Sequence, residues 1–294
     1  MFDIIIKEMK KDKMNSIKTL FNEHQNEPFT YVADACLFKM FSWLKPFRAF
    51  VAEVDGQVIG CIYGLRYLFG YGWIGGLLIH KNFRRLGIGR RLLGAILDFL
   101  GPGYSYLFVE PQNLAAKRLF ENMSFKAVYR RLNYLVQTPL AGFQTTCDNI
   151  TCHVEWGDVN EAIGFKERGG VINMGYYPVK VTENIFEDLR RERKVLKCGS
   201  VVAFVENSWR VNINGYEFTF NDNILREMPI LLPKKRVVEV IPFYIRPELS
   251  DLAKLINHLT AQGEVIVWAY EQDPVIWRLP LKGVLGVMVM EHYK

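Results

Sequence analysis

The sequence has few cysteines and lacks any long apolar segment. Its five cysteines are odd in number and show no Cys-x-x-Cys spacing, so the pattern indicates reduced thiols in a cytoplasmic protein and no metal site. The longest apolar stretch without a charge, Tyr67 to Ile79, is shorter than the ~20 residues that cross a bilayer. At the N-terminus the apolar run covers only Ile4 to Ile6, which predicts no secretory signal.

Low-complexity and disordered classes are also excluded. The 23 glycines and 12 prolines follow no period, and collagen would need a strict one. Half of the residues are hydrophobic and 14% are aromatic, which is far more apolar material than a disordered chain carries. A length of 294 residues at roughly 150 residues per domain predicts two domains.

A net excess of positive charge is found only in the first half of the chain. Residues 1–137 hold 19 Lys and Arg against 11 Asp and Glu, a net +8, and residues 138–294 hold 18 against 20, a net −2. This asymmetry is typical of a site for a polyanionic ligand, although a solvated basic face fits it equally well. The arginine pairs at 84–85, 90–91 and 130–131 lack the interleaved aromatic residues of a nucleic-acid surface. Nucleic acid is therefore disfavoured as a partner.

The apolar periodicity of residues 1–137 predicts a mixed α/β unit. We expect strands over 2–9, 49–54, 58–65, 71–79, 104–109, 125–129 and 134–137, and helices over 15–24, 31–44, 90–100 and 114–122. Asp55-Gly56 is typical of a hairpin turn. Gly75-Gly76 inside a strand predicts a bulge or a close backbone approach. A linker follows at about 138–146.

Two glycines stand where the chain enters the helix predicted at 90–100. In the segment Arg84-Arg85-Leu86-Gly87-Ile88-Gly89, Gly87 and Gly89 let backbone N–H groups converge, and the helix dipole adds positive potential for phosphate. Tight packing alone can also require such a pair. Because a third glycine is missing and no Gly-Lys-Ser/Thr follows, neither the dinucleotide fingerprint nor a P-loop fits.

The residues from Ile79 to Leu92 resemble the acyl-CoA loop of the GCN5-related N-acetyltransferases, with its Arg/Gln-x-x-Gly-x-Gly/Ala pattern. The segment from Asn113 to Phe125 is similar to the second signature of that family, Asn-x-x-Ala-x-x-x-Tyr-x-x-x-Gly-Phe. The resemblance covers about residues 1–137. It implies an α/β mixed sheet of the acyl-CoA N-acyltransferase fold, in which the strands before and after the helix splay apart.

The resemblance also implies a function. Acetyl-CoA would be the co-substrate, with no metal, and a primary amine of a protein or small molecule would attack it directly. Its pantetheine would bond to main-chain groups of the first splayed strand, and its pyrophosphate would lie on the loop. The residues implied for binding are Leu77, Leu78, Ile79, Arg84, Arg85, Leu86, Gly87, Ile88, Gly89, Arg90, Asn113 and Lys117.

Two family positions lack their usual polar residue. The tyrosine that protonates the leaving thiolate corresponds to Phe120, and the glutamate base of the ribosomal-protein alanine acetyltransferases corresponds to Phe108. The main-chain N–H near Leu78 would hold the oxyanion. The candidates for acid or base are Tyr129, Tyr134, Glu110 and Glu53, and Glu27 and Asp34 could receive a cationic acceptor. An alternative function is a non-catalytic acyl-CoA sensor or adaptor.

Residues 138–294 carry no acyl-CoA signature, but their predicted order parallels the first half. Strands are expected over 200–206, 208–212, 216–220, 237–245, 264–270 and 286–292, and helices over 182–194 and 248–259. Pro247 and Glu248 stand where the phosphate loop would be, removing one donor and adding repulsion to an anion. This half is either a degenerate acetyltransferase-like domain without CoA or an unrelated α+β domain. The sequence indicates no oligomeric state.

Overall fold

The computed structural model describes most of the chain. The described residues are 3–29, 38–42, 44, 46–144, 150–174, 177–213, 216–227, 234–281 and 283–294. The helix predicted over 31–44 lies mostly outside them, and so does Asp34; residues 38–41 are helical.

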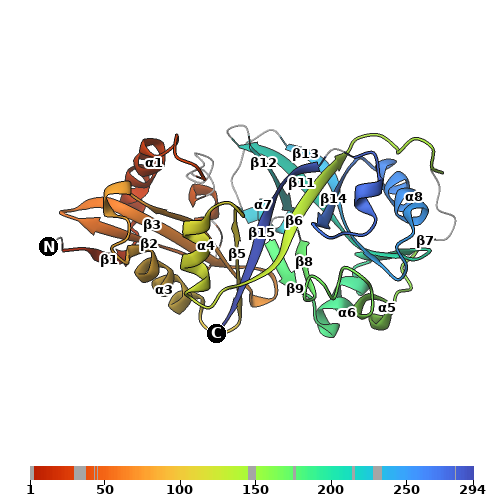
Figure 1. The fold of residues 1–294 in the computed structure, drawn as a ribbon, viewed down its shortest axis with the longest axis horizontal. Coiled ribbons are helices and arrows are strands. Elements are labelled where there is room, and N and C mark those ends of the chain that lie inside the picture. Colours follow the sequence, from red (N-terminus) through yellow and green to blue (C-terminus); the bar gives the residue numbers. More distant parts are fainter. Residues whose placement is uncertain are drawn as a thin grey trace.

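A sheet of 13 strands runs through both halves (Figure 1). Its order is β1-β2-β3-β4-β5-β15-β6-β14-β13-β11-β10-β7, with β12 added beside β11. The strands of the first half are β1 Ile5–Glu8, β2 Phe47–Val54, β3 Gln57–Arg66, β4 Gly72–Ile79, β5 Tyr104–Val109 and β6 Lys126–Val136. The others are β7 Ile150–Thr151, β10 Val195–Cys198, β11 Val201–Ile213, β12 Tyr216–Asn221, β13 Lys234–Tyr244, β14 Glu264–Tyr270 and β15 Gly283–Tyr293. A separate hairpin pairs β8 Val171–Met174 with β9 Tyr177–Lys180.

Helices cover both faces of this sheet. They are α1 Met14–Glu23, α3 Ile88–Leu100, α4 Leu114–Glu121, α5 Trp156–Asn160, α6 Glu183–Arg191, α7 Asp222–Glu227 and α8 Leu249–Thr260, with short 3₁₀ segments η1 Lys11–Lys13, η2 Leu68–Gly70, η3 Lys81–Phe83 and η4 Ile276–Arg278. α3 buries its apolar side, including Leu92, Leu93 and Ile96, against the sheet. It ends at Gly101, whose φ of 67° lies in the left-handed region where glycine is favoured.

Local signals in the sequence predicted most of the first half. The Asp55-Gly56 hairpin joins β2 and β3, and both turn residues have positive φ, 48° and 78°, as such a turn requires. β5 has the predicted bounds. The prediction of two strands over 125–129 and 134–137 is wrong, because β6 runs unbroken from Lys126 to Val136. Strands of the second half pair along its whole length, so the polar residues between the two apolar runs do not interrupt it.

The two halves exchange strands. β15, the last strand of the second half, lies between β5 and β6 of the first half and pairs antiparallel with both. On its other edge β6 pairs with β14 of the second half. In Figure 1, β15 runs beside β6 through the middle of the molecule. The sheet of residues 1–137 is therefore completed by residues from the far end of the sequence.

The second half repeats the order of the first around a parallel strand pair. β13, α8 and β14 follow each other as β4, α3 and β5 do, and β13 pairs in parallel with β14 over only four residue pairs, Val237–Glu264 to Val240–Val267. The register between β11 and β13 is regular. The N-terminus of α8 is occupied by acidic side chains, since Glu248 precedes it and Asp251 in its first turn accepts bonds from the N–H and hydroxyl of Ser200.

Three apolar clusters hold the halves together. One lies under α3 and α4, a second surrounds α8, and the third extends over the opposite face of the sheet and includes residues from α1 to β15. Tyr67 of the first half stacks on Tyr177 of β9 with ring centroids 4.7 Å apart. The Tyr71 hydroxyl donates to the carbonyl oxygen of Lys180 at 2.6 Å. The interface is thus a continuous core on this face.

Cysteine chemistry differs from the sequence prediction at one position. Cys61 and Cys152 are free thiols, as expected, but Cys198 at the end of β10 is disulfide-bonded. Disulfides persist in oxidising compartments and in intracellular proteins of hyperthermophiles, so cysteine usage no longer supports a reducing compartment. Within the described ranges, no helix has both the length and the apolar character needed to cross a bilayer.

Candidate functional site

The parallel strands β4 and β5 separate soon after they meet. Only two residue pairs are formed, Gly72 with Ser105 and Trp73 with Tyr106, although β4 continues to Ile79 and β5 to Val109. In the described chain, no strand pairs with the edge of β4 that faces β5 beyond Trp73. This is the splay that the family resemblance implied, and beyond Trp73 it leaves one edge of β4 without a strand partner in the described chain.

A bulge in β4 lies beside this opening. The register against β3 shifts between the pairs Cys61–Leu78 and Tyr63–Gly75. Gly76 has a φ of 62°, in the left-handed region that glycine adopts without strain. The Cys61 thiol contacts the Gly76 carbonyl oxygen at 3.5 Å. The bulge predicted from Gly75-Gly76 is confirmed.

The same two glycines also permit a close approach. A Cβ on Gly75 would collide with the hydroxyl and ring end of Tyr63, and one on Gly76 would lie 2.8 Å from the Cδ1 atom of that ring. Tyr63, on β3, is 2% exposed. Its phenol therefore lies flat across the bulge, on the face of β4 that also carries Trp73 because alternate residues share a face.

The loop between β4 and α3 has the form of an anion site. Arg85 and Gly87 have φ values of 64° and 75°, and α3 begins immediately afterwards at Ile88, two residues before its predicted start. The first main-chain bond of this turn runs from the N–H of Arg91 to the carbonyl of Gly87 at 3.2 Å. The N–H groups of Ile88, Gly89 and Arg90 precede it and have no partner within the helix. Together with the helix dipole they can hold phosphate oxygens.

Gly87 and Gly89 serve different purposes in this loop. Gly87 is in open space, and its positive φ is what requires glycine. A Cβ on Gly89 would lie 3.0 Å from Leu119 of α4, so this glycine lets the two helices pack closely. The packing interpretation is therefore confirmed for Gly89, whereas phosphate binding at Gly87 stays a prediction.

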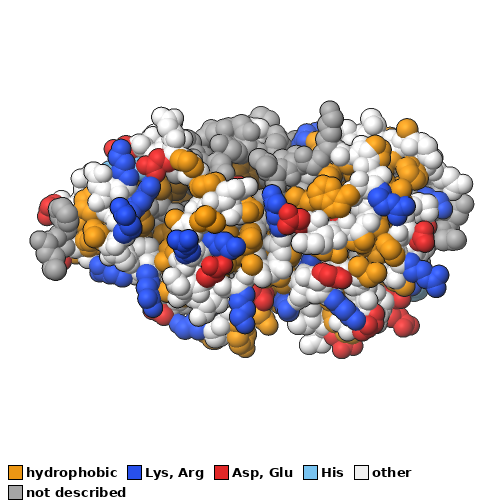
Figure 2. Space-filling view, in the orientation of Figure 1, with side chains coloured by type: hydrophobic (Ala, Val, Ile, Leu, Met, Phe, Trp, Pro, Cys, Tyr) orange, Lys and Arg blue, Asp and Glu red, His pale blue; other side chains and the backbone are white. Residues whose placement is uncertain are grey.

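The arginines in and just after this loop differ in the contacts of their side chains. Arg84 bonds to the carboxylate of Glu27, after α1, and its Nε donates to the carbonyl oxygen of Ile79 at 3.0 Å. Arg91 donates to the carbonyl of Ile4 at 3.0 Å. Arg85 and Arg90 are exposed. Figure 2 shows Lys and Arg side chains spread over the first half in this view, whereas Asp and Glu gather toward the region of α5 and α6.

Helix α4 borders the loop from the other side. Asn113 is its N-cap: the side-chain oxygen accepts a hydrogen bond from the N–H of Ala116 at 3.1 Å. Lys117, half-buried, lies 3.9 Å from the carboxylate of Glu121 one turn later. Asn113 thus has a local structural task in addition to the contact with pantetheine that the resemblance implied.

The candidate catalytic side chains do not converge. Phe120 is buried in the core under α3 and α4, 5.8 Å between ring centroids from Phe125. Tyr134 points toward the cluster around α8, on the opposite side of β6 from Tyr129. Burial raises the pKa of both hydroxyls. Glu110 is half-buried just beyond β5.

Leu78 and Glu53 occupy other positions. Leu78 lies on β4 beside the bulge, where its N–H belongs to the splayed strand. The Glu53 carboxylate is ion-paired with Lys7 at 2.6 Å on the far side of the hairpin β2–β3. In the described part of the chain, the contacts of Tyr129, Tyr134, Glu110 and Glu53 do not place their polar atoms together at the opening between β4 and β5.

Aromatic rings enclose the face of the opening opposite α3. Trp73 is 4.6 Å from Phe108 and 5.7 Å from Tyr177, and Phe41 is within 6 Å of both Tyr177 and Tyr63, at 5.9 and 5.6 Å between centroids. We call the rings of Phe41, Tyr63, Trp73, Phe108 and Tyr177 the aromatic wall. Tyr177 comes from the second half, so that half contributes to the site.

Arg131 of β6 closes the wall on one side. Its guanidinium carbon lies 4.0 Å from the centroid of Phe108 and 4.5 Å from that of Trp268. Sequence reasoning missed Tyr63, Tyr177 and Arg131. The side of the sheet on which such a side chain lies, and what it contacts there, is known only when the neighbouring strands are known. The Gly75-Gly76 pair was the one signal that a bulky side chain approaches β4.

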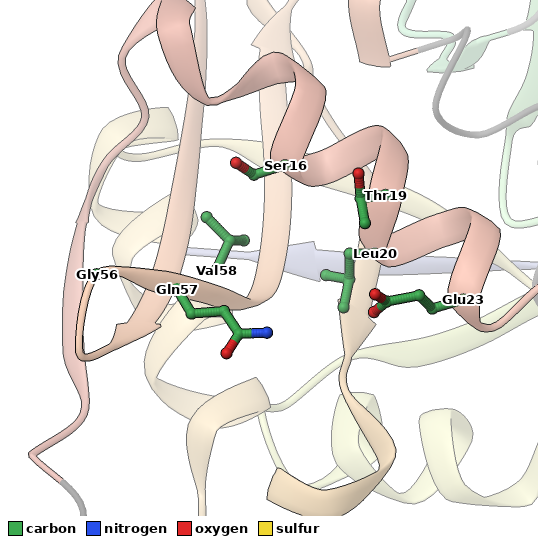
Figure 3. A pocket seen from close by; sticks show the side chains of 7 residues that line it. All are labelled: Ser16, Thr19, Leu20, Glu23, Gly56, Gln57 and Val58. Atoms are coloured by element: carbon green, nitrogen blue, oxygen red, sulfur yellow. The ribbon is translucent and has the colours of Figure 1, made fainter.

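A separate shallow pocket lies on the α1 side of the hairpin β2–β3 (Figure 3). It is lined by Ser16, Thr19, Leu20, Glu23, Gly56, Gln57 and Val58. It contains no residue of the α3 loop and none of the aromatic wall, so it is not part of the site.

Comparison with known proteins agrees with this geometry. Residues 18–125 match the model of the acetyltransferase (GNAT) family. An N-alpha-acetyltransferase of Sulfurisphaera tokodaii is 35% identical over 102 residues, and an uncharacterized N-acetyltransferase of Methanocaldococcus jannaschii is 28% identical over 127. These matches cover 29% and 42% of this chain and 61% and 78% of those proteins. An uncharacterized Mycobacterium leprae protein is 42% identical over 58 residues, 20% of this chain and 16% of its own length.

Among solved structures, the whole chain has counterparts. The GCN5-related N-acetyltransferase of Sphaerobacter thermophilus has a TM-score of 0.50 at 12% identity, covering 99% of this chain and 95% of that one. At such identity the likeness establishes the fold alone. Residues 18–125 thus form a domain of the acetyltransferase (GNAT) family, within a chain that has the fold of GNAT acetyltransferases from one end to the other.

Proposed function

We propose that the protein is an acetyl-CoA-dependent N-acetyltransferase, which moves the acetyl group to a primary amine of a protein or small molecule. The observation that carries the proposal is the separation of β4 from β5 directly beside the open N-terminus of α3. A GNAT-family match over 18–125 supports it, because this segment contains both features. A cytoplasmic location belongs to the same proposal.

The residues present fit acetyl-CoA. The pyrophosphate would lie on the N–H groups at the start of α3, with Arg85 and Arg90 exposed nearby. Main-chain groups between Leu77 and Ile79 would bond the pantetheine amides along the edge of β4 that no described strand covers, as an added strand would. The start of α8 in the second half offers no equivalent, because Glu248 and Asp251 stand there. We therefore expect one acetyl-CoA per chain.

The aromatic wall would assist the attacking amine. An alkyl ammonium has a pKa near 10.4 in water, and transfer to apolar surroundings disfavours its charged form. The aromatic ring of Phe108, in place of the carboxylate found there in the related enzymes, thus favours the neutral, nucleophilic form of the amine. Deprotonation then needs no dedicated base. The departing thiolate belongs to a thiol with a pKa near 8.5, so it leaves without protonation by the residue at Phe120.

Positioning would supply most of the acceleration. Holding amine and thioester together is worth effective molarities of ~10⁵ M or more, whereas one acid or base contributes ~10²–10⁴-fold. The N–H near Leu78 would hold the developing oxyanion. Activity with Phe at both family positions is consistent with these magnitudes.

Two measurements test the proposal. Titration calorimetry with acetyl-CoA should give a saturable heat at a stoichiometry of one per chain, and CoA release should depend on an added amine. A panel of free-N-terminus peptides, lysine peptides, polyamines and arylalkylamines serves as acceptors. Binding without release for any amine would favour the acyl-CoA sensor instead, and absence of heat at millimolar acetyl-CoA would refute both.

A further inference from the structure

His24 is the C-cap of helix α1 and is almost completely buried, at 1% exposure. Its Nδ1 atom lies 2.8 Å from the carbonyl oxygen of Leu20, one turn back along the helix. Its Nε2 atom accepts a hydrogen bond from the main-chain N–H of Lys81 at 3.1 Å. Lys81 opens η3, the short turn between β4 and the loop that is proposed to bind the pyrophosphate. One ring therefore joins the end of α1 to the segment that enters the loop.

The two partners of this ring determine its protonation state. A carbonyl oxygen can only accept a hydrogen bond, and a main-chain N–H can only donate one. Both bonds form only when Nδ1 carries the proton and Nε2 is bare. The geometry thus requires a neutral imidazole at His24, whereas histidine is the side chain that changes charge between about pH 5 and pH 8.

A second contact joins the same two segments. Glu27, three residues after His24, is ion-paired with Arg84 at the start of the loop. Nε of Arg84 in turn donates to the carbonyl oxygen of Ile79 at 3.0 Å. The other carboxylate oxygen of Glu27 lies 3.8 Å from Nε2 of His24. A proton on Nε2 would oppose the N–H of Lys81 and would attract the carboxylate that holds Arg84, so both contacts would weaken together.

His80 is a second imidazole beside His24. The two rings are edge-on, with centroids 4.9 Å apart. Burial, and after it the neighbouring His24, lowers the pKa of His80. Its titration must therefore be separated from that of His24 in any experiment. The other charged groups of the two segments are Glu23, Glu27, Lys81 and Arg84.

We propose that neutral His24 is a positioning residue for the acetyl-CoA loop, an inference that rests on the proposed acetyltransferase function. Through the N–H of Lys81 the ring holds the chain where it leaves β4, so that the N–H groups at the start of α3 converge on the pyrophosphate. A proton on Nε2 releases this hold. Acetyl-CoA binding is therefore coupled to the deprotonation of His24, and the affinity falls as pH decreases through the range in which this histidine titrates.

Titration calorimetry with acetyl-CoA at a series of pH values tests this role in His24→Gln, His24→Leu and the unaltered protein. The Gln side chain has a carbonyl oxygen that can accept the N–H of Lys81, and it does not titrate. At about pH 8 its affinity should stay close to that of the unaltered protein, whereas His24→Leu should bind roughly tenfold more weakly, the effect of one lost hydrogen bond. Toward about pH 5 the affinity of the unaltered protein should fall by roughly fivefold more than that of His24→Gln.

Two controls separate His24 from other titrating groups. A phosphate monoester such as that of CoA has a second pKa of about 6, but its contribution is common to all variants and cancels in the ratio of their affinities. His80→Asn removes the neighbouring imidazole and keeps an acceptor for the N–H of Asn82, so it should keep the pH dependence of the unaltered protein. Far-ultraviolet circular dichroism shows whether each variant is folded.

The protonation state of His24 can also be observed directly. Long-range nitrogen–proton NMR spectra of the protein without cofactor should show a protonated Nδ1 and a bare Nε2 at neutral pH, with His24→Gln identifying the signals. A bare Nδ1, or parallel affinity profiles in His24→Gln and the unaltered protein, would overturn the role of His24 and leave the proposed function standing. Absence of heat in the unaltered protein at every pH would instead overturn the proposed function, and this role with it.

Discussion

At the scale of single residues, Gly87 provides the sharpest test of the proposed phosphate loop. Gly87→Ala adds a Cβ in open space, so the change acts through the φ of 75° alone, which costs an L-residue ~1–2 kcal/mol. If the loop relaxes to avoid this cost, the N–H groups of α3 no longer converge. We expect acetyl-CoA affinity, measured by calorimetry, to fall at least tenfold.

Gly94→Ala is its control within the same helix. Gly94 is interior to α3 with nothing near its missing Cβ, so alanine should stabilise the protein by ~0.5–1 kcal/mol and leave acetyl-CoA affinity unchanged. Equal affinity in the Gly87 variant and this control would remove the loop from the cofactor site.

A buried glutamate predicts an unusual dependence of stability on pH. Glu239 of β13 is fully buried against Trp268, and burial raises its pKa from the ordinary 4.5 to about 7. Between these values the folded state binds more protons than the unfolded state, so its contribution to stability falls as pH rises from about 4.5 to 7. Glu239→Gln should remove this slope, up to about 3 kcal/mol, in urea unfolding at a series of pH values.

Glu53→Gln should show the opposite sign. Burial raises the pKa of Glu53, but the ion pairs with Lys7 and Lys13 outweigh burial and lower it. Its stabilising contribution is therefore present above the pKa of the unfolded state and lost as pH falls through the pKa of the folded state.

For Glu239, the free energy of unfolding of Glu239→Gln is compared with that of the unaltered protein. If the difference between them does not change across pH 4.5–7, the burial of a titrating carboxyl is contradicted.

At the scale of elements, substitutions of Asn113 can distinguish its role as the N-cap of α4 from its proposed role in binding pantetheine. Asn113→Ala removes the N-cap, which costs ~0.5–2 kcal/mol, and also removes the side chain that the family resemblance assigns to pantetheine. Asn113→Ser restores a cap. We expect urea unfolding to show lost stability only in the Ala variant, and calorimetry to show weaker acetyl-CoA binding in both. Unchanged affinity in the Ser variant would leave Asn113 with the cap alone.

Elements with local signals were predictable and those set by distant partners were not. The Asp55-Gly56 turn, β5 and α4 follow from turn chemistry and periodicity within a few residues. β6 was divided in two, because its continuity depends on β14 and β15, more than a hundred residues away. In the site, the loop at Gly87 carries a signature, whereas Tyr177 reaches Trp73 only through the packing of the second half.

At the scale of the whole molecule, the exchanged strand predicts a single unfolding unit. Since β15 supplies the partner of both β5 and β6, neither half keeps a complete sheet when the other unfolds. Far-ultraviolet circular dichroism and tryptophan fluorescence should therefore give coincident urea transitions. Two separated transitions would show that residues 1–137 and 138–294 are independent domains, as the length of the chain alone suggested.

The position of β15 also has a consequence for biosynthesis. Translation delivers β5 and β6 well over a hundred residues before the strand that separates them, so both carry unpaired edges while the ribosome finishes the message. Such edges are templates for wrong pairing. The nascent N-terminal half therefore stays incomplete, and the proposed acetyl-CoA site can reach its final geometry only after residue 293 has been synthesised and β15 has inserted between β5 and β6.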